Sequence, residues 1–231
     1  MELAKPRVDV GLNTNNLEAL LAFWQNEAGA KFDFVLPLAP GMKQHRHDIN
    51  GSVLKINHYR DPLADRAPSG YAEVLIARDG LMAAKTLHDP DGNAVTLVPR
   101  GTHGIDQIGI KLKVRNIAAH RRFYTDALGL PEIDAKPFTA FKAAETVILL
   151  EEAADAPAEA AFDGKGWRYI TFQIFKVDTE HAQVLASGTG SEGFPPRTLG
   201  ETARISMVRD PDGNWIELSQ RASITGSLTP G

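Results

Sequence analysis

A carboxylate that follows directly after a rigid turn is the first feature of this sequence able to do chemistry. Residues 210–214 read Asp-Pro-Asp-Gly-Asn. The proline presets φ at the first corner, the glycine supplies the positive φ that closes the turn, and Asp210 can accept hydrogen bonds from the turn's own backbone. Ile216 and Leu218 then alternate with Glu217 along a predicted strand, so the carboxylate points to the polar face. It can serve there as a general acid, a general base or a metal ligand.

Three histidines form a second constellation, on a predicted hairpin. Asn50-Gly51 is a strong signal for a two-residue hairpin turn, and it joins predicted strands at 43–49 and 52–59. The turn type fixes the register of the two strands. Counting outward from the turn gives these opposed pairs: Ile49 with Ser52, His47 with Leu54, His45 with Ile56, and Lys43 with His58.

Opposed residues share a face, so the three imidazoles point the same way, whereas Arg46 and Lys55 point the other way. Three imidazoles can hold Zn²⁺ or another divalent ion with an open position. They can equally contact an anionic substrate, or form an ordinary polar face near the protein's edge. The sequence leaves these alternatives open. The other four histidines fall in turns or on predicted helix surfaces and are expected to be solvated: His88, His103, His120 and His181.

The composition argues against several classes of partner. A length of 231 residues with 43% hydrophobic content allows one large domain or two smaller ones, each with its own core. The net charge is −4 without any run of Lys or Arg, which argues against nucleic acid and anionic membranes. The sequence has no cysteine, and hence no disulfide or thiolate chemistry. No apolar run is long enough to span a membrane, so we expect a cytoplasmic protein.

The elements that position these residues recur along the chain. Residues 89–93 repeat the Asp-Pro-Asp-Gly-Asn turn, and Thr96 stands where Glu217 stands in the later copy. A strand followed by a helix is predicted at 8–14 and 17–28, and again from 107 onward, with Gly29 and Gly129 ending the two helices. The order restarts after residue 104. This predicts an abbreviated domain at 6–100, which lacks a helix after Ala77, a complete domain at 104–220, and a tail at 221–231.

Four stretches of the second half resemble the vicinal oxygen chelate superfamily, which includes glyoxalase I, extradiol dioxygenases, methylmalonyl-CoA epimerase and bleomycin resistance proteins. They are Gln107–Ile110, Arg122–Gly129, Arg168–Phe172, and the turn at 210–214 with the Glu217 strand. The resemblance is weaker over 6–100. It implies an α+β fold of paired βαβββ modules, with two glyoxalase-like halves in one chain and one cup per half. Because such modules often pair, it also allows a homodimer.

The same resemblance implies where the site residues lie. The family's metal positions carry over to Gln107, Tyr169 and Glu217 in the second half, and to Asp9, Tyr71 and Thr96 in the first. Extradiol enzymes are expected to offer two histidines and a glutamate to Fe(II), and both histidine positions are filled otherwise here. Two options remain: one divalent ion (Fe, Zn, Mn or Ni), with its ligands undetermined, or metal-free chemistry.

Two functions are compatible with this pattern. The first is a small-molecule enzyme of the vicinal oxygen chelate type that acts on a carbonyl or oxygenated aromatic compound, as an isomerase, a lyase or a dioxygenase-like enzyme. Burial would favour the protonated form of Glu217 and make it a usable acid or base, Tyr169 would donate to an oxyanion, and Gln107 would orient a carbonyl. The predicted substrate contacts are His45, His47, His58 and Trp215. The alternative is a metal-free binding or resistance protein without catalysis, which the loss of both histidines favours.

Overall fold

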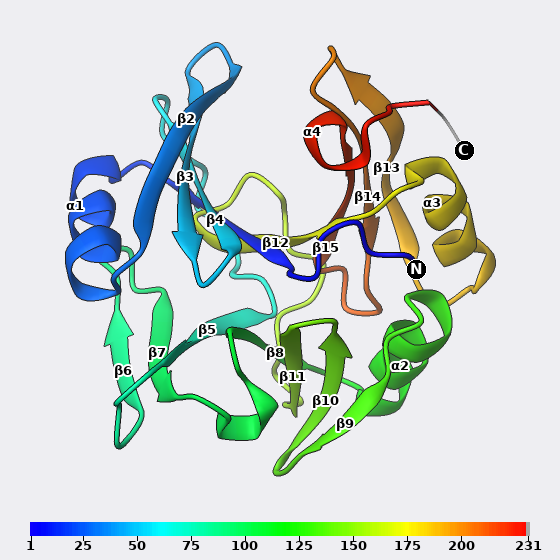
Figure 1. Cartoon of the computed structure of the whole chain (residues 1–231). Coiled ribbons are helices and arrows are strands. Elements are labelled where there is room, and N and C mark those ends of the chain that lie inside the picture. Colours follow the sequence, from blue (N-terminus) through cyan, green and yellow to red (C-terminus); the bar gives the residue numbers. More distant parts are fainter. Residues whose placement is uncertain (230–231) are drawn as a thin grey trace.

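The fold consists of two β-sheets placed back to back. The computed structural model describes residues 1–229, so the last two residues of the predicted tail lie outside the described part. Figure 1 shows one sheet above the other, with helices at the sides. The predicted α+β class is confirmed. Within residues 1–229, no helix is long and apolar enough to cross a membrane.

The upper sheet combines the two ends of the chain. Its strands run in the order β13-β14-β15-β12-β1-β4-β3-β2. Their bounds are β1 (Asp9–Thr14), β2 (Lys31–Ala39), β3 (Met42–Ile49), β4 (Ser52–Tyr59), β12 (Gly166–Gln173), β13 (Ser191–Leu199), β14 (Ala203–Arg209) and β15 (Trp215–Arg221). The hairpins β2–β3 and β13–β14 rise on opposite sides of this sheet and give it the shape of a cup (Figure 1). We call its open face the eight-stranded cup.

The lower sheet uses the middle of the chain, in the order β6-β7-β5-β8-β11-β10-β9. Its strands are β5 (Tyr71–Arg78), β6 (Lys85–His88), β7 (Ala94–Pro99), β8 (Ile108–Val114), β9 (Glu132–Ala135), β10 (Phe138–Ala143) and β11 (Thr146–Glu152). We call its open face the seven-stranded cup. No helix separates β5 from β6, as the abbreviated first half predicts. The expectation of one cup per half is wrong, because each sheet takes strands from both halves.

The two sheets enclose the main hydrophobic core. Val10 of β1 and Ile170 of β12 pack there with Ile76 of β5 and Ile110 of β8, all at most 1% exposed. Because side chains alternate along a strand, the residues between them face the two cups. The apolar side chains of each sheet fill the core between the sheets, and the alternate side chains therefore reach the open face.

The first helix of each half follows the same pattern. α1 (Leu17–Ala22) continues as a π-helical turn at Phe23–Glu27, and α2 (Ile117–Arg122) continues as a π-helical turn at Phe123–Ala127. Gly29 and Gly129 follow with positive φ, as predicted for residues that end a helix. The Asn116 side chain caps α2 by accepting a hydrogen bond from the Ala119 amide at 2.9 Å. The remaining helices are a 3₁₀ turn at Thr102–Gly104, α3 (Val177–Ala186) and α4 (Ala222–Thr225).

Four strands were not predicted: β2, β6, β9 and β13. β2 and β13 are the edges of the eight-stranded sheet, and most of their side chains are exposed. Pro37 lies in β2, Pro195 and Pro196 lie in β13, and register shifts interrupt both pairings. Proline is tolerated at a sheet edge because its missing N–H faces solvent. An edge strand of this kind has no alternating pattern for the sequence to reveal.

Candidate functional site

A cavity of about 310 Å³ opens in the eight-stranded cup. Its walls come from β2–β4 on one side and β13–β15 on the other, with Phe162 and Tyr169 between them. Larger hollows of about 370 and 400 Å³ occur elsewhere on the surface, but neither borders Glu217. We therefore place the candidate site in the cup.

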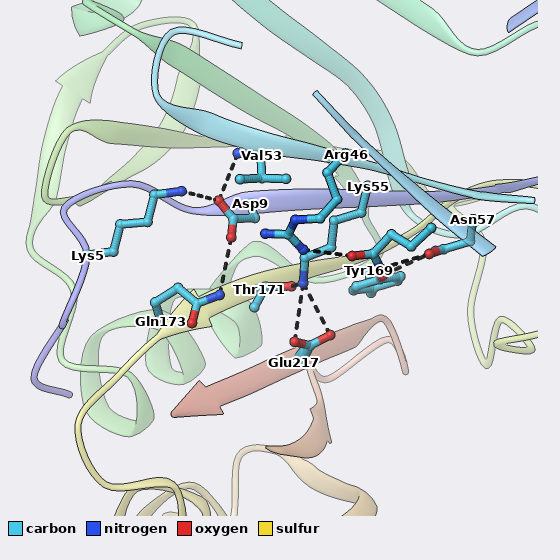
Figure 2. A network of polar contacts seen from close by, with 11 residues as sticks. Lys5, Asp9, Arg46, Val53, Lys55, Asn57, Tyr169, Thr171, Gln173 and Glu217 are labelled. Carbon is cyan, nitrogen blue, oxygen red and sulfur yellow. Dashed lines mark hydrogen bonds and ion pairs between the residues drawn. The ribbon is translucent and has the colours of Figure 1, made fainter. Parts of the chain in front are cut away.

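Lys55 and Glu217 meet at the floor of this cavity. The Lys55 Nζ lies 3.2 Å from Oε1 and 3.4 Å from Oε2 of Glu217, and it donates a 2.6 Å hydrogen bond to Thr171 Oγ1. Figure 2 shows the ammonium between these two side chains. The Lys55 side chain is 4% exposed and that of Glu217 is 13% exposed. The sequence did not predict this contact between an ammonium and both carboxylate oxygens of Glu217.

Burial also acts on the lysine. It lowers the pKa of Lys55, while the charges of Glu217 and Asp9 act in the opposite direction. Asp9 is itself occupied, since it accepts hydrogen bonds from Lys5 Nζ at 2.6 Å and from the Val53 amide at 2.8 Å. Gln173 Nε2 reaches its second oxygen at 3.3 Å (Figure 2). Asp9 therefore supports the floor, while Glu217 is the carboxylate that borders the cavity.

Tyr169 stands beside this ion pair. Its ring fits because residue 11 is glycine, and a Cβ there would overlap the ring. The hydroxyl oxygen accepts hydrogen bonds from Asn57 Nδ2 at 3.1 Å and Gln44 Nε2 at 3.4 Å. Burial, reinforced by the charge of Glu217, raises the pKa of Tyr169 well above its usual value. Tyr169 is therefore a phenol whose own proton points to no acceptor among the described residues, and it can donate to a ligand.

Gln107 does not join this group. It precedes β8 in the seven-stranded sheet, where its carbonyl accepts hydrogen bonds from the Ala77 amide and the Asn50 side chain. The two predicted sets of ligand positions, one for each half of the chain, are not kept together, because each sheet takes residues from both sets. Asp9, Tyr169 and Glu217 belong to the eight-stranded sheet, whereas Tyr71, Thr96 and Gln107 belong to the seven-stranded one. The placement of Gln107 beside Glu217 is thus corrected, because the modules at the two ends of the chain pair with each other.

The histidine hairpin forms with the predicted register, pair for pair from Ile49–Ser52 to Lys43–His58. The shared face of His45, His47 and His58 is the one opposite the cavity. His47 is fully buried there, with Gln25 Nε2 at 3.1 Å and the Phe32 ring at 5.6 Å between centroids. The His45 and His58 ring centroids are 6.5 Å apart. Burial lowers the pKa of His45 and of His47. None of the three borders the cavity, so contact with a substrate bound there is not available to them.

Trp215 lies at the border of the site. Its Nε1 donates a 2.7 Å hydrogen bond to the Ala160 carbonyl, and the Arg209 guanidinium lies 4.1 Å from its ring centroid. It packs on Phe162 at 5.3 Å, and Phe162 lines the cavity. Trp215 therefore supports the wall through Phe162.

Two histidines expected in solvent are buried. His120 is 0% exposed, and its Nδ1 lies 2.9 Å from the Asn116 carbonyl. Its Nε2 lies 3.4 Å from Asp210, the residue that organises the main turn. Burial alone lowers the pKa of His120, but the contact with Asp210 outweighs it and the pKa is raised. His181 is 5% exposed and approaches Glu192 at 3.1 Å. Both lie on helix faces that pack inward.

Sequence reasoning missed Lys55 as a site residue. Its signal was present, because a lysine between the apolar Leu54 and Ile56 places a charge in mid-strand, on the face opposite the histidines. The missing information was long-range: only the pairing of β1 with both β4 and β12 brings Lys55 to Thr171 and Glu217.

Comparison with known proteins agrees with this architecture. Residues 104–218 match the family model of the Glyoxalase/Bleomycin resistance protein/Dioxygenase superfamily. Glyoxalase I from Zea mays superposes with a TM-score of 0.75 at 14% identity, over 96% of this chain and 95% of that chain. Its V278E mutant gives 0.77 at 15% identity, over 96% of each chain. A putative dioxygenase from Bacillus subtilis subsp. subtilis str. 168 gives 0.67 at 12% identity, over 100% and 92%. No curated protein sequence matches significantly.

The two sheets, the Asp-Pro-Asp-Gly-Asn turn and the matched family model define the class of protein. The chain belongs to the glyoxalase, bleomycin resistance protein and dioxygenase superfamily, also called the vicinal oxygen chelate superfamily. Within it, the chain has the two-domain architecture seen in glyoxalase I structures, with two glyoxalase-like halves. At this level of identity, the likeness to solved structures shows the fold alone.

Proposed function

We propose that the eight-stranded cup binds a small carbonyl or oxygenated aromatic compound and moves a proton on it, with Glu217 as the base. The observation that carries this proposal is the Lys55–Glu217 ion pair at the floor of the cavity. The Lys55 ammonium contacts both oxygens of Glu217, and the carboxylate borders the cavity, where it can accept a proton from a bound compound. Buried charges are costly, and a buried pair open to a cavity is typical of a functional site.

The neighbours of Glu217 supply the other half of the chemistry. When a proton leaves a carbon next to a carbonyl, negative charge develops on the carbonyl oxygen. The Tyr169 hydroxyl can donate to that oxygen, and Gln44 and Asn57 hold the hydroxyl in place. Returning the proton to the same or another atom completes an epimerisation or isomerisation, and loss of a leaving group completes an elimination. These outcomes use the same base and the same donor.

The residues at the family's ligand positions do not fit a divalent metal ion. In the eight-stranded cup these positions hold Asp9, Tyr169 and Glu217. Asp9 is engaged by Lys5, Tyr169 keeps its proton, and an ammonium already contacts both oxygens of Glu217. A divalent ion at this carboxylate would sit next to that positive charge. Within residues 1–229, no group of three or more His, Asp or Glu side chains is arranged to hold a metal. The proposed chemistry therefore uses no metal.

Proton exchange tests the proposal before the substrate is known. A panel of ketones, 2-oxo acids and aryl ketones is incubated with the protein in D₂O, and loss of the proton next to the carbonyl is followed by NMR. We expect exchange with some members of the panel, reduced by about 10²–10⁴-fold in Glu217→Gln. Absence of exchange across the panel, or equal exchange by Glu217→Gln, would contradict the proposal.

The seven-stranded cup provides a matched control. Glu73 forms an ion pair with Lys111 there, so Glu73→Gln removes a comparable carboxylate from the other sheet. We expect the Glu73→Gln variant to exchange protons as the unchanged protein does. Equal losses of proton exchange in the two variants would show that the substitutions act through folding and not through removal of the base.

A second candidate function is binding without chemistry. It is favoured by the apolar part of the cavity wall, which includes Leu36, Met42 and Phe194 and suits an aromatic compound. A pure binding protein would hold its ligand almost as well after Glu217→Gln and would exchange no protons. The exchange assay, combined with a binding measurement, separates the two functions.

A further inference from the structure

The cavity in the eight-stranded cup carries more positive than negative charge. Its wall includes four cationic side chains and one carboxylate. The carboxylate, Glu217, is matched by Lys55. The other three cations are Arg46, Arg197 and Arg221. Three guanidinium groups therefore face one cavity without carboxylate partners lining it.

Arg46 is fixed in an orientation in which it can bind an anion. The residue is 6% exposed, so more than nine-tenths of it is buried. Gln44 Oε1 accepts a 2.7 Å hydrogen bond from its Nη1, which fixes the plane of the guanidinium. The Nε is buried and has no hydrogen-bond partner among the described residues. A buried donor without an acceptor destabilises the free protein, and more so when the donor carries a charge. An anion in the cavity would remove that cost.

Arg221 adds a second positive charge at the same place. Burial lowers the pKa of Arg221, and the charge of Arg46 lowers it further, while Glu217, Asp9 and Asp33 act in the opposite direction. Arg46 and Arg221 therefore repel each other across the cup. Within residues 1–229, the Arg221 guanidinium forms no ion pair. Two like charges near each other on a cavity wall favour a ligand of opposite charge.

We infer that this cavity binds a small organic carboxylate, with its carboxylate group between Arg46 and Arg221 and its apolar part against the Phe194 side of the wall. A guanidinium offers a planar fork of donors that matches a carboxylate in two places at once. Arg197, stacked on Phe194 at 4.2 Å, lies on the same β13–β15 wall as Arg221 and keeps the potential of the cavity positive. The substrate class is then a carboxylic acid that also carries a carbonyl group near Glu217, an assignment that rests on the proposed function.

Matched acids and amides test the inference without knowledge of the natural substrate. The probes are phenylacetate, 3-phenylpropionate and hexanoate, each compared with its neutral amide, which has nearly the same shape. Binding to the full chain is measured by ligand-observed NMR at low and high salt. We expect the acids to bind at least about tenfold more tightly than their amides, a difference of about 1.4 kcal/mol. Salt should reduce this preference, because it screens charges.

Three variants localise the effect. Arg221→Met and Arg46→Lys should each reduce the preference for acids, the first by removing a charge and the second by removing the fork. Arg60→Met is the control, because Arg60 pairs with Asp61 on the surface and does not line the cavity. It should leave the preference unchanged. Thermal unfolding of each variant verifies that the protein is folded, and Arg221→Met decides the matter if Arg46→Lys is unstable.

The outcomes distinguish this inference from the proposed function. If acids bind no better than amides, if no acid binds in the millimolar range, or if folded Arg221→Met keeps the full preference, the carboxylate site is wrong. If acids bind preferentially but no carbonyl compound exchanges protons, the site stands and the proposed chemistry fails. If neutral ketones exchange protons while acids show no preference, the chemistry stands and the carboxylate site fails.

Discussion

The two cups share a scaffold but differ in what covers their floors. Each has an Asp-Pro-Asp-Gly-Asn turn that leads into a strand, and in each the first aspartate accepts the same hydrogen bonds from its turn. In the eight-stranded cup that strand presents Glu217, and in the seven-stranded cup it presents Thr96. Gly11 pairs with Lys55 in the first sheet, and Gly109 pairs with Val147 at the corresponding place in the second.

These residue differences leave the seven-stranded cup filled with packed apolar side chains. Val147 belongs to a second hydrophobic cluster on the seven-stranded face, together with Leu75, Leu149, Ala140 and other apolar side chains. A charged pair persists beside this cluster, where Lys111 and Thr96 contact Glu73. The eight-stranded cup keeps a cavity and a polar floor instead. The comparison shows how one architecture can use a cup either for stability or for binding.

The largest expected effect comes from placing the lysine of the eight-stranded cup at the corresponding position of the seven-stranded cup. Val147→Lys would bury an ammonium in an apolar cluster without a carboxylate partner. We expect a loss of about 3–5 kcal/mol in the free energy of unfolding, measured by urea denaturation. Thr139→Lys, at a half-buried position of the neighbouring strand β10, is the control and should cost much less. A stable Val147→Lys protein would mean that the seven-stranded cup can also admit a charge.

The converse change removes the pair from the eight-stranded cup. Lys55→Met leaves the Glu217 carboxylate without its ammonium, whereas Lys55→Met combined with Glu217→Gln removes both charges. We expect the double variant to be more stable than the sum of the single changes predicts, with a coupling of about 0.5–3 kcal/mol in the free energy of unfolding. Additive losses would show that the two side chains do not interact in solution.

The contact between His120 and the second turn predicts that the stability of the protein depends on pH. His120 contacts Asp210 in the second turn and its pKa is raised above 6.5, so the folded state binds the proton more tightly than the unfolded state. That contribution to stability is complete below pH 6.5 and is lost as the pH rises through the higher pKa of the folded state. Compared with His120→Gln, the unchanged protein should therefore lose stability between weakly acidic and weakly alkaline pH. Parallel urea curves for the two proteins at every pH would contradict this.

The smallest expected difference concerns the turn glycines. Gly92 and Gly213 have φ of +84° and +81°, which disfavours any other residue. A Cβ at Gly92 would meet nothing within 4 Å, whereas one at Gly213 would lie 3.0 Å from the Glu159 backbone. Gly92→Ala should cost about 1–2 kcal/mol from the backbone alone, and Gly213→Ala should cost more. Thermal unfolding checks the order, and equal costs would mean that the loop containing Glu159 moves away easily.

Local features of this fold were predictable because they depend on neighbours in the sequence. The turn at 210–214, the register from Asn50-Gly51 and the ends of the two long helices follow from φ preferences and hydrogen bonds that span a few residues. The pairing of the sheets was not predictable in this way. Alternation shows that Lys55 and the histidines face opposite sides of one hairpin, but it does not tell which side becomes the cup. That depends on β12 and β15, more than 100 residues away.

The sharing of the upper sheet between the chain's two ends has a consequence for folding. The lower sheet uses only residues 71–152, so all its strands are available early during synthesis. Lys55 meets Glu217 across 162 positions, and the cup exists only after β15 has been made. Contacts of such high sequence separation form slowly. We expect the lower sheet to gain protection from hydrogen exchange first during refolding, and ligand binding to appear only with the slower closure of the upper one.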